Sequence, residues 1–268
     1  MTALQFVDVE TARAARGPRL IVASSLPSPW SEAAKGIVHV KQLPVLVVSY
    51  PRVDEALRQW TGAVNVPVLL NDDEPPRTGW AEILSFAERR GGAVSLIPDD
   101  AETRVRHHGL AHELAGEEGL GWCGRLVMTD GGLTSGGARS FPLPVAQRLA
   151  GKYGYAPERM ALVLARMREI LALFDRQLAQ SRAAGHRYLL GARLTALDIY
   201  LATFLTSLLP LAEGDCPQVA PLVRPALDYL AQQIGGDVPT ALIEHRTFMF
   251  QSHLPWPIRL RPDAPPAG

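Results

Sequence analysis

The stretch LLGARLTALDIYLA, residues 189–202, decides the fold, because it predicts both where a helix begins and how deeply that helix is buried. Thr195 stands just before the apolar run and Asp198 follows three residues later, which is the spacing of a capping box with aspartate in place of the more usual glutamate. Residues 194–209 are apolar nearly all round, as in a helix buried on every side. We therefore expect this helix to be the centre of an all-helical domain.

The chain around this helix also has helical periodicity. In residues 159–181, apolar side chains recur at offsets of three and four and form one stripe. Residues 116–157 are rich in glycine and turn formers, so we expect an irregular insertion of roughly 40 residues there, a lid or an ornament. The predicted helical domain spans residues 93–268.

The first third of the chain alternates between strand and helix patterns. After a polar leader, residues 1–18, the strands are expected at 19–24, 44–49 and 65–70, and the helices at 29–42, 53–60 and from Trp80 to Arg90. The turn-rich acidic residues 71–77 suggest a hairpin or an edge strand. This βαβα order favours an α/β layer with parallel strands, and we place the end of this domain at residue 92.

The composition excludes several function classes. Lys and Arg number 27 and Asp and Glu number 27, so the formal net charge of zero gives no electrostatic case for nucleic acid or an anionic membrane. Cys123 and Cys216 lie far apart, which suggests neither a disulfide framework nor a zinc site. His108 and His112 have the spacing of a two-histidine metal site but lack further ligands, so no metal is expected. We expect a cytoplasmic protein that binds a small molecule or another copy of itself.

Two proline motifs could carry chemistry. Ser28 precedes Pro29 at the turn from the first strand to the first helix, the position of an N-cap. It either caps the helix or donates a hydrogen bond to a thiolate bound at the positive helix end. Val66-Pro67 opens the third strand, and a cis bond there would turn the backbone of Val66 outward to pair with a peptide-like ligand.

Three motifs of the chain, in this order, resemble the cytosolic glutathione S-transferase superfamily. They are Ser28-Pro29, Val66-Pro67 and the stretch 189–202. The resemblance implies a thioredoxin-like N-terminal domain that binds glutathione, a helical-bundle C-terminal domain, an apolar small-molecule electrophile and a homodimer. It implies that Ser28 stabilises the glutathione thiolate, and that Val66, before the presumed cis-Pro67, pairs with the cysteinyl backbone of glutathione.

The sequence departs from the family where a Glu/Gln-Ser pair grips the γ-glutamyl group. The matching positions are Thr78 and Gly79, so the side-chain carboxylate and hydroxyl are missing. The backbone N–H groups at this helix start and the neighbouring Arg77 remain available to a ligand carboxylate. Because Ser28 replaces the cysteine of some subclasses, a mixed disulfide with glutathione is excluded.

Several other charged and aromatic residues are candidates for the ligand mouth. In the first domain these are Trp30, Glu74, Arg77 and Trp80, and Glu117, Trp122 and Arg125 of the second domain are candidates to face them. The alternative is a structural Arg–carboxylate pair with packed tryptophans.

Three functions remain open: a transferase that activates glutathione for attack on an apolar electrophile, a binding protein with weak or lost glutathione affinity, and a glutathione-dependent lyase acting on a specific metabolite.

Overall fold

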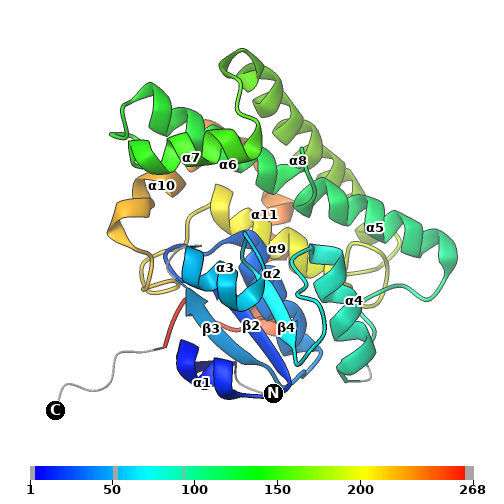
Figure 1. The fold of residues 1–268 in the computed structure, drawn as a ribbon. Helices are drawn as coiled ribbons and strands as arrows, with labels where there is room; N and C mark the ends of the chain where they lie inside the picture. Colours follow the sequence, from blue (N-terminus) through cyan, green and yellow to red (C-terminus); the bar gives the residue numbers. More distant parts are fainter. Residues whose placement is uncertain (1–3, 51–53, 93, 263–268) are drawn as a thin grey trace. The chain divides into compact units, whose positions relative to one another are not determined.

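The structure, a computed structural model, describes residues 4–50, 54–92 and 94–262. It contains two compact units (Figure 1). The first comprises the chain up to Val94 together with Ala212–Val219 and the chain from Leu254 onward, and the second comprises Ser95–Leu211 and Ala220–His253. The predicted combination of an α/β domain and an all-helical domain is therefore confirmed.

The first unit is built on a four-stranded sheet of order β1-β3-β2-β4. β1 and β2 each run parallel to β3, whereas β4 runs antiparallel to β2. The elements of this sheet and its helices are β1 (Gln5–Val7), α1 (Val9–Ala14), β2 (Pro18–Ala23), α2 (Pro29–Val40), β3 (Leu46–Tyr50), α3 (Glu55–Thr61), β4 (Val68–Asn71) and α4 (Trp80–Arg90).

Local sequence signals explain where these helices begin. Asp54 caps α3 by accepting a hydrogen bond from the N–H of Leu57 at 2.9 Å, and α3 ends at Gly62, whose positive φ of 68° suits glycine. Val53, where this helix was expected to start, lies outside the described residues. Residues 1–18 were expected to be a polar leader, and this was wrong for the residues that form β1 and α1. Asp8 caps α1, which packs against β3 of the sheet.

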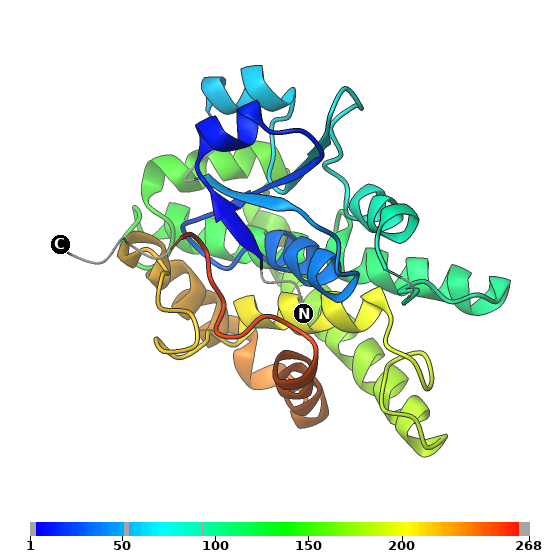
Figure 2. The same cartoon turned by 90° about the horizontal axis from the view of Figure 1, so that it is seen from below.

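The last part of the chain belongs to the first unit, although residues 93–268 were expected to form one domain. We call residues 254–262 the C-terminal strap. Leu254, Ile258 and Leu260 are buried, and the N–H of Ile258 donates to the carbonyl of Asp215 at 2.9 Å. Figure 2 shows the strap, coloured red, running along α2 toward the end of β3.

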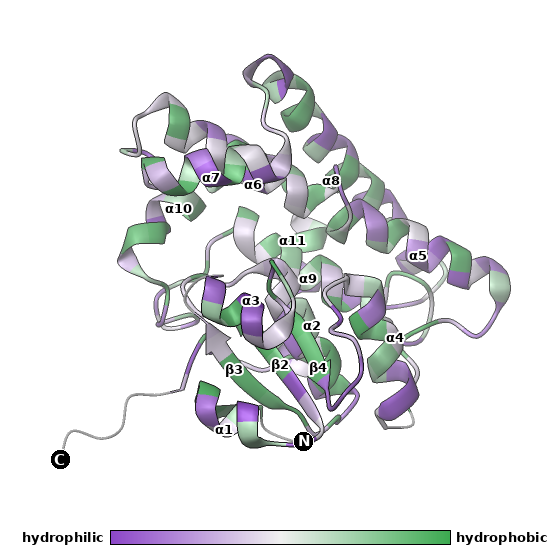
Figure 3. Ribbon diagram, in the orientation of Figure 1, coloured by the Kyte–Doolittle hydropathy of each residue, from purple (hydrophilic) through white to green (hydrophobic). Residues whose placement is uncertain are grey.

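The second unit is entirely helical. Its long helices are α5 (Ala101–Ala115), α6 (Leu120–Thr134), α7 (Leu143–Tyr153), α8 (Met160–Ala183), α9 (Ala196–Leu208), α10 (Arg224–Ile234) and α11 (Thr240–Ser252), with short 3₁₀ turns at Pro157–Arg159, Pro221–Val223 and Gly235–Asp237. Hydrophobic and hydrophilic residues alternate along α8, as its apolar stripe predicts (Figure 3).

Helix α9 is the buried centre of this unit, as the sequence predicts. Every residue of α9 is buried. Asp198 reaches back to accept from the N–H of Thr195 at 3.0 Å, its other oxygen accepts from the N–H of Leu189 at 2.9 Å, and it lies 3.2 Å from Nε2 of His245. The predicted capping box between Thr195 and Asp198 is present, and the hydroxyl of Thr195 also donates to Asp198 at 2.9 Å. The carboxylate thus joins α9 to the preceding loop and to α11.

The expectation of an irregular insertion at residues 116–157 was wrong, because most of this segment forms α6 and α7. Two of its glycines, Gly131 and Gly132, allow neighbouring parts of the chain to pack closely. A Cβ at Gly132 would stand 2.6 Å from the carbonyl oxygen of Phe141 and 2.8 Å from Cβ of Ala146. A Cβ at Gly131 would stand 2.5 Å from the ring of Tyr229.

None of the helices in the described part of the chain combines the length and the hydropathy needed to cross a membrane.

Candidate functional site

The segments that carry the predicted site residues flank β2, β4 and the start of α4 in the first unit. The N–H of Ser24, directly after β2, donates to the carbonyl of Tyr50 at the end of β3 at 3.2 Å. β4 pairs with β2 in the register Ile21↔Val68, so continuing this register by two residues sets Val66 opposite Ala23. The ends of β2 and β3 therefore meet the beginning of β4 where the loop to Ser28 starts.

The start of α4 follows a segment that pairs with β4. Arg77 pairs with Leu69 in an isolated antiparallel bridge, with backbone hydrogen bonds of 2.9 and 3.0 Å. This bridge holds the chain beside β4 three residues before α4 begins at Trp80. The Val66–Pro67 bond is cis, and no described residue hydrogen-bonds to the backbone of Val66.

Ser28 occupies the N-cap of α2, and its hydroxyl makes no capping hydrogen bond. Its backbone is extended, at φ −65° and ψ 120°, and its carbonyl accepts the first helical bond, from the N–H of Glu32 at 2.9 Å. Ser28 is 6% exposed, and Trp30, two residues into the helix, is half-buried. The structure therefore does not support the interpretation that the Ser28 side chain caps α2.

The backbone N–H groups at the start of α4 are occupied by a carboxylate of the chain itself. Oε2 of Glu82 accepts from the N–H of Gly79 at 2.9 Å and from the N–H of Thr78 at 3.2 Å. Glu82 is the third residue of α4, so this is the backbone half of a capping box. A ligand carboxylate would have to displace Glu82 to reach these two groups.

Arg77 is likewise engaged by the protein. Its guanidinium donates to Glu74 at 2.5 Å and lies over the ring of Phe86, 4.8 Å from the ring centroid. The hydrogen bond from Arg77 is the main cause that lowers the pKa of Glu74, which also pairs with Arg90 at 2.7 Å. The structure thus contains the Arg–carboxylate pair of the structural alternative.

Glu32 and Lys35 form a buried ion pair in α2 that sequence reasoning missed. Their charged atoms are 2.7 Å apart, and the side chains are 6% and 4% exposed. Burial raises the pKa of Glu32, and the ammonium of Lys35 opposes this shift. Oε1 of Glu32 has no hydrogen-bond partner in the described part of the chain. The only sequence signal was the i,i+3 spacing of opposite charges, which usually marks an exposed pair.

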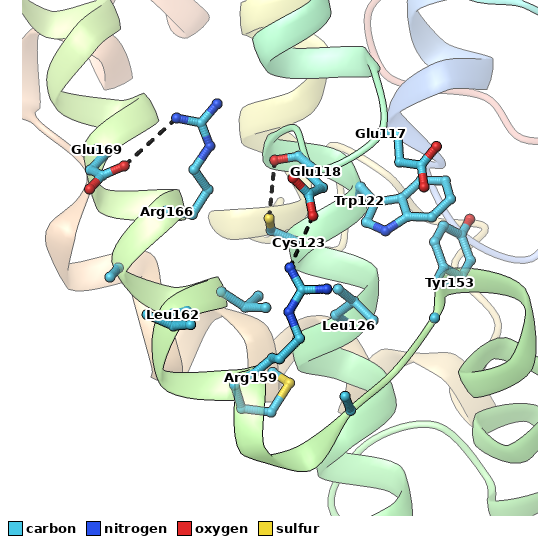
Figure 4. A pocket seen from close by; sticks show the side chains of 15 residues that line it. Glu117, Glu118, Trp122, Cys123, Leu126, Tyr153, Arg159, Leu162, Arg166 and Glu169 are labelled. Carbon is cyan, nitrogen blue, oxygen red and sulfur yellow. Dashed lines mark hydrogen bonds and ion pairs between the residues drawn. The ribbon is translucent and has the colours of Figure 1, made fainter.

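The second unit has a pocket of its own, of about 380 Å³ (Figure 4). Its floor contains the buried side chains of Cys123, Leu126 and Val163. Trp122 and Tyr153 meet edge to face on one side, with ring centroids 4.6 Å apart. Such a floor and wall suit an apolar small molecule.

Charged residues form the rim of this pocket. Arg159 pairs with Glu118 at 3.0 Å, and Arg166 pairs with Glu113 and lies 3.7 Å from Glu169. Glu117 also lines the pocket, whereas Arg125 is buried and hydrogen-bonds to Tyr153.

The cysteine and histidine side chains described in the second unit form neither a reactive thiol nor a metal-binding cluster. Burial raises the pKa of the Cys123 thiol to about 11, which keeps it protonated near neutral pH. His108 binds the carbonyl of Arg104 through Nδ1 at 2.9 Å. Among the residues with described positions, no three His, Cys, Asp or Glu side chains gather closely enough to hold a metal ion.

Comparison with known proteins agrees with this architecture. Residues 157–231 match the family described as glutathione S-transferase, C-terminal domain. No curated protein matches the chain in sequence.

Solved structures share the fold over most of the chain. A glutathione S-transferase from Methylobacterium radiotolerans, in complex with glutathione sulfonate, is 20% identical, with a TM-score of 0.55 over 88% of this chain and 91% of its own. A β-etherase from Sphingobium is 17% identical, with a TM-score of 0.55 over 87% and 99%. A glutathione transferase family member from Pseudomonas fluorescens, with two glutathione molecules bound, is 16% identical, with a TM-score of 0.53 over 92% and 98%. Residues 157–231 thus match the C-terminal domain family, and the chain as a whole has the fold of the cytosolic glutathione S-transferase superfamily.

Proposed function

We propose that the protein is an enzyme of the glutathione transferase type that activates the thiol of glutathione at Ser28. The observation that carries this proposal is the Ser28 hydroxyl, which stands at the positive end of α2 and is not used for capping. It is available to donate to a sulfur anion. A similar fold binds glutathione in the protein from P. fluorescens and glutathione sulfonate in the protein from M. radiotolerans.

In this proposal glutathione lies along the edge of the sheet. Val66 pairs with its cysteinyl backbone beside Pro67, and Trp30 lies next to the thiol. Arg77, Thr78 and Gly79 receive the γ-glutamyl end after Glu82 has moved aside. The cell compartment is the cytoplasm and the assembly is a homodimer, as the family resemblance implies.

The chemical step is a nucleophilic substitution at carbon. The thiolate sulfur attacks an electrophilic carbon of an apolar substrate and forms a C–S bond, while the leaving group departs with the bonding electron pair. The thiol proton goes to solvent when the thiolate forms. The hydroxyl of Ser28 and the α2 dipole stabilise the anion before the attack, so they lower the thiol pKa rather than take part in bond breaking.

The test compares Ser28→Ala with Ser85→Ala, a control on α4. A hydrogen bond to a charged group contributes about 1.5 kcal/mol, so the pKa of bound glutathione should rise by about one unit in Ser28→Ala. Conjugation to a chlorodinitrobenzene should slow about tenfold near neutral pH. Titration of the thiolate absorbance and kcat/KM measure both effects. Equal pKa values in the two variants would remove Ser28 from this role.

A second candidate is a binding protein of the same fold with weak glutathione affinity. The contact of Glu82 with Thr78 and Gly79 favours it, because the chain already satisfies the groups that a ligand carboxylate needs. Calorimetric titration with glutathione separates the candidates: millimolar or weaker binding to wild type, together with no turnover, supports the binding protein. A glutathione-dependent lyase would use the same site as the transferase.

A further inference from the structure

The C-terminal strap is bonded to α2, which follows the Ser28 loop, and to β3, which lies beside β2. On α2, Nζ of Lys35 donates to the carbonyl of Arg259 at 2.7 Å. On β3, the hydroxyl of Ser49 donates to the carbonyl of Leu260 at 2.6 Å, and the side chain of Leu260 is fully buried. The strap is therefore a packed part of the first unit, next to the helix that begins after Ser28 and to the neighbour of β2 in the sheet.

Gln218 fixes the end of the strap. Its side-chain oxygen accepts from the N–H of Leu260 at 2.7 Å and from the N–H of Arg261 at 3.0 Å, and its amide nitrogen donates to the carbonyl of Arg261 at 3.1 Å. Two of these hydrogen bonds engage the N–H and the carbonyl of Arg261, so the backbone of Arg261 has little freedom. The Cα atom of Arg261, from which its side chain extends, is therefore held in place.

The guanidinium of Arg261 continues this connection into the loop that carries Ser28. Its Nη1 donates to the carbonyl of Gln218 at 3.0 Å and to the carbonyl of Ser24 at 3.4 Å. Ser24 is the first residue after β2, and its own N–H is bonded to Tyr50 of β3. With both backbone groups of Ser24 engaged, the start of the loop is held from two sides.

We propose that Arg261 is a positioning residue that holds the Ser24–Ser28 loop so that the Ser28 hydroxyl is aimed at the bound thiol. Its catalytic part rests on the proposed function of Ser28, whereas its structural part does not. A cation bridging two carbonyl groups is suited to this task, because a charge-assisted hydrogen bond is stronger than a neutral one. Loss of Arg261 leaves the strap held by Gln218 and Leu260 but releases the carbonyl of Ser24.

The test uses the full chain with Arg261→Ala, Arg261→Lys and the control Arg16→Ala. Arg16 is an exposed arginine of the same unit with no contact with the loop, its nearest partner being Asp73 at 3.8 Å. Hydrogen exchange of residues 24–31 is measured first, because it reports the opening of the loop without requiring activity. The pKa of bound glutathione and the pH profile of kcat are measured second.

We expect exchange of the loop to be about fivefold faster in Arg261→Ala than in wild type or Arg16→Ala, with Arg261→Lys in between. The pH profile of kcat should move to higher pH in Arg261→Ala and return in Arg261→Lys. Unchanged exchange in Arg261→Ala overturns the inference, whatever the activity. Faster exchange in a protein whose wild type lacks glutathione chemistry supports the structural part and refutes the proposed function. If the wild type is active and exchange is faster in Arg261→Ala, but the pH profile of kcat does not move in that variant, the proposed effect of Arg261 on Ser28 is overturned.

Discussion

Replacing Glu82 with alanine should strengthen glutathione binding. The carboxylate of Glu82 accepts from the N–H groups of Thr78 and Gly79, where the γ-glutamyl carboxylate is proposed to bind. In wild type the ligand must first displace this internal carboxylate. In Glu82→Ala the two N–H groups at the positive end of α4 are open to the ligand.

The size of the effect follows from the contact that is lost. Capping by an exposed side chain at a helix start contributes about 1 kcal/mol to stability. In wild type, glutathione must break this capping contact in order to bind, whereas in the variant the contact is absent. The expected gain is therefore about 1 kcal/mol, or about fivefold in Kd. The ligand-free variant should lose up to about 1 kcal/mol of stability, partly offset by the high helix propensity of alanine.

Isothermal titration calorimetry with two ligands measures this gain. Glutathione carries the γ-glutamyl group and cysteinylglycine lacks it, so only the Kd for glutathione should fall in Glu82→Ala. Glu55→Ala is the matched control, because Glu55 is also a first-turn glutamate of a helix in the same unit. It should bind both ligands as wild type does.

Two results would refute this reasoning. Equal glutathione affinity in wild type and Glu82→Ala would mean that the N–H groups of Thr78 and Gly79 do not receive the ligand. Weaker binding in the variant would mean that Glu82 assists the ligand, for example by holding its ammonium group.

Three further predictions concern the second unit. Gly132→Ala should lose about 1–3 kcal/mol of stability in urea denaturation because its Cβ would meet Phe141, whereas Gly109→Ala, with open space around it, should gain about 0.5–1 kcal/mol. Asp198→Asn should cost about 3 kcal/mol by the same assay, since it removes the charge that serves three buried donors; a loss below about 1 kcal/mol would contradict this. The raised pKa of Cys123 predicts that the free energy of unfolding falls as pH rises from about 9 to about 11, because the unfolded thiol ionises first. Cys123→Ala should flatten this fall in denaturation curves measured across that range.

Periodicity and capping signals predicted most of the fold. The strand and helix order between Arg19 and Arg90 and the buried helix α9 agree with the sequence analysis, because alternating apolar runs and the Thr195–Asp198 pair are local signals. Glycine content misled the analysis for α6. A glycine that admits a neighbouring helix and a glycine that breaks a helix look the same in one sequence, and only the packing partner, such as Tyr229 at Gly131, separates them.

The site was predicted less completely than the fold. The order of Ser28 and Val66 along the chain predicts a site at this end of the sheet, and this stays a prediction. The structure shows that the strand before Ser28, β2, is paired with the strand after Val66, β4. The sequence analysis did not predict that Glu82 binds the N–H groups of Thr78 and Gly79. A glutamate at the third position of a helix is nevertheless a known sign of a capping box. The bond of Arg261 to Ser24 joins residues 237 positions apart, and no local pattern predicts such a contact.

The position of the C-terminal strap has a consequence for biosynthesis. A ribosome releases the chain from its N-terminus, so β2, α2 and β3 emerge long before the residues that hydrogen-bond to Lys35 and Ser49. The first unit is therefore completed only after all seven α-helices of the second unit have been synthesised. Nascent chains should carry an unfinished N-terminal unit until the strap has been synthesised, and a premature stop before residue 254 would leave that unit open.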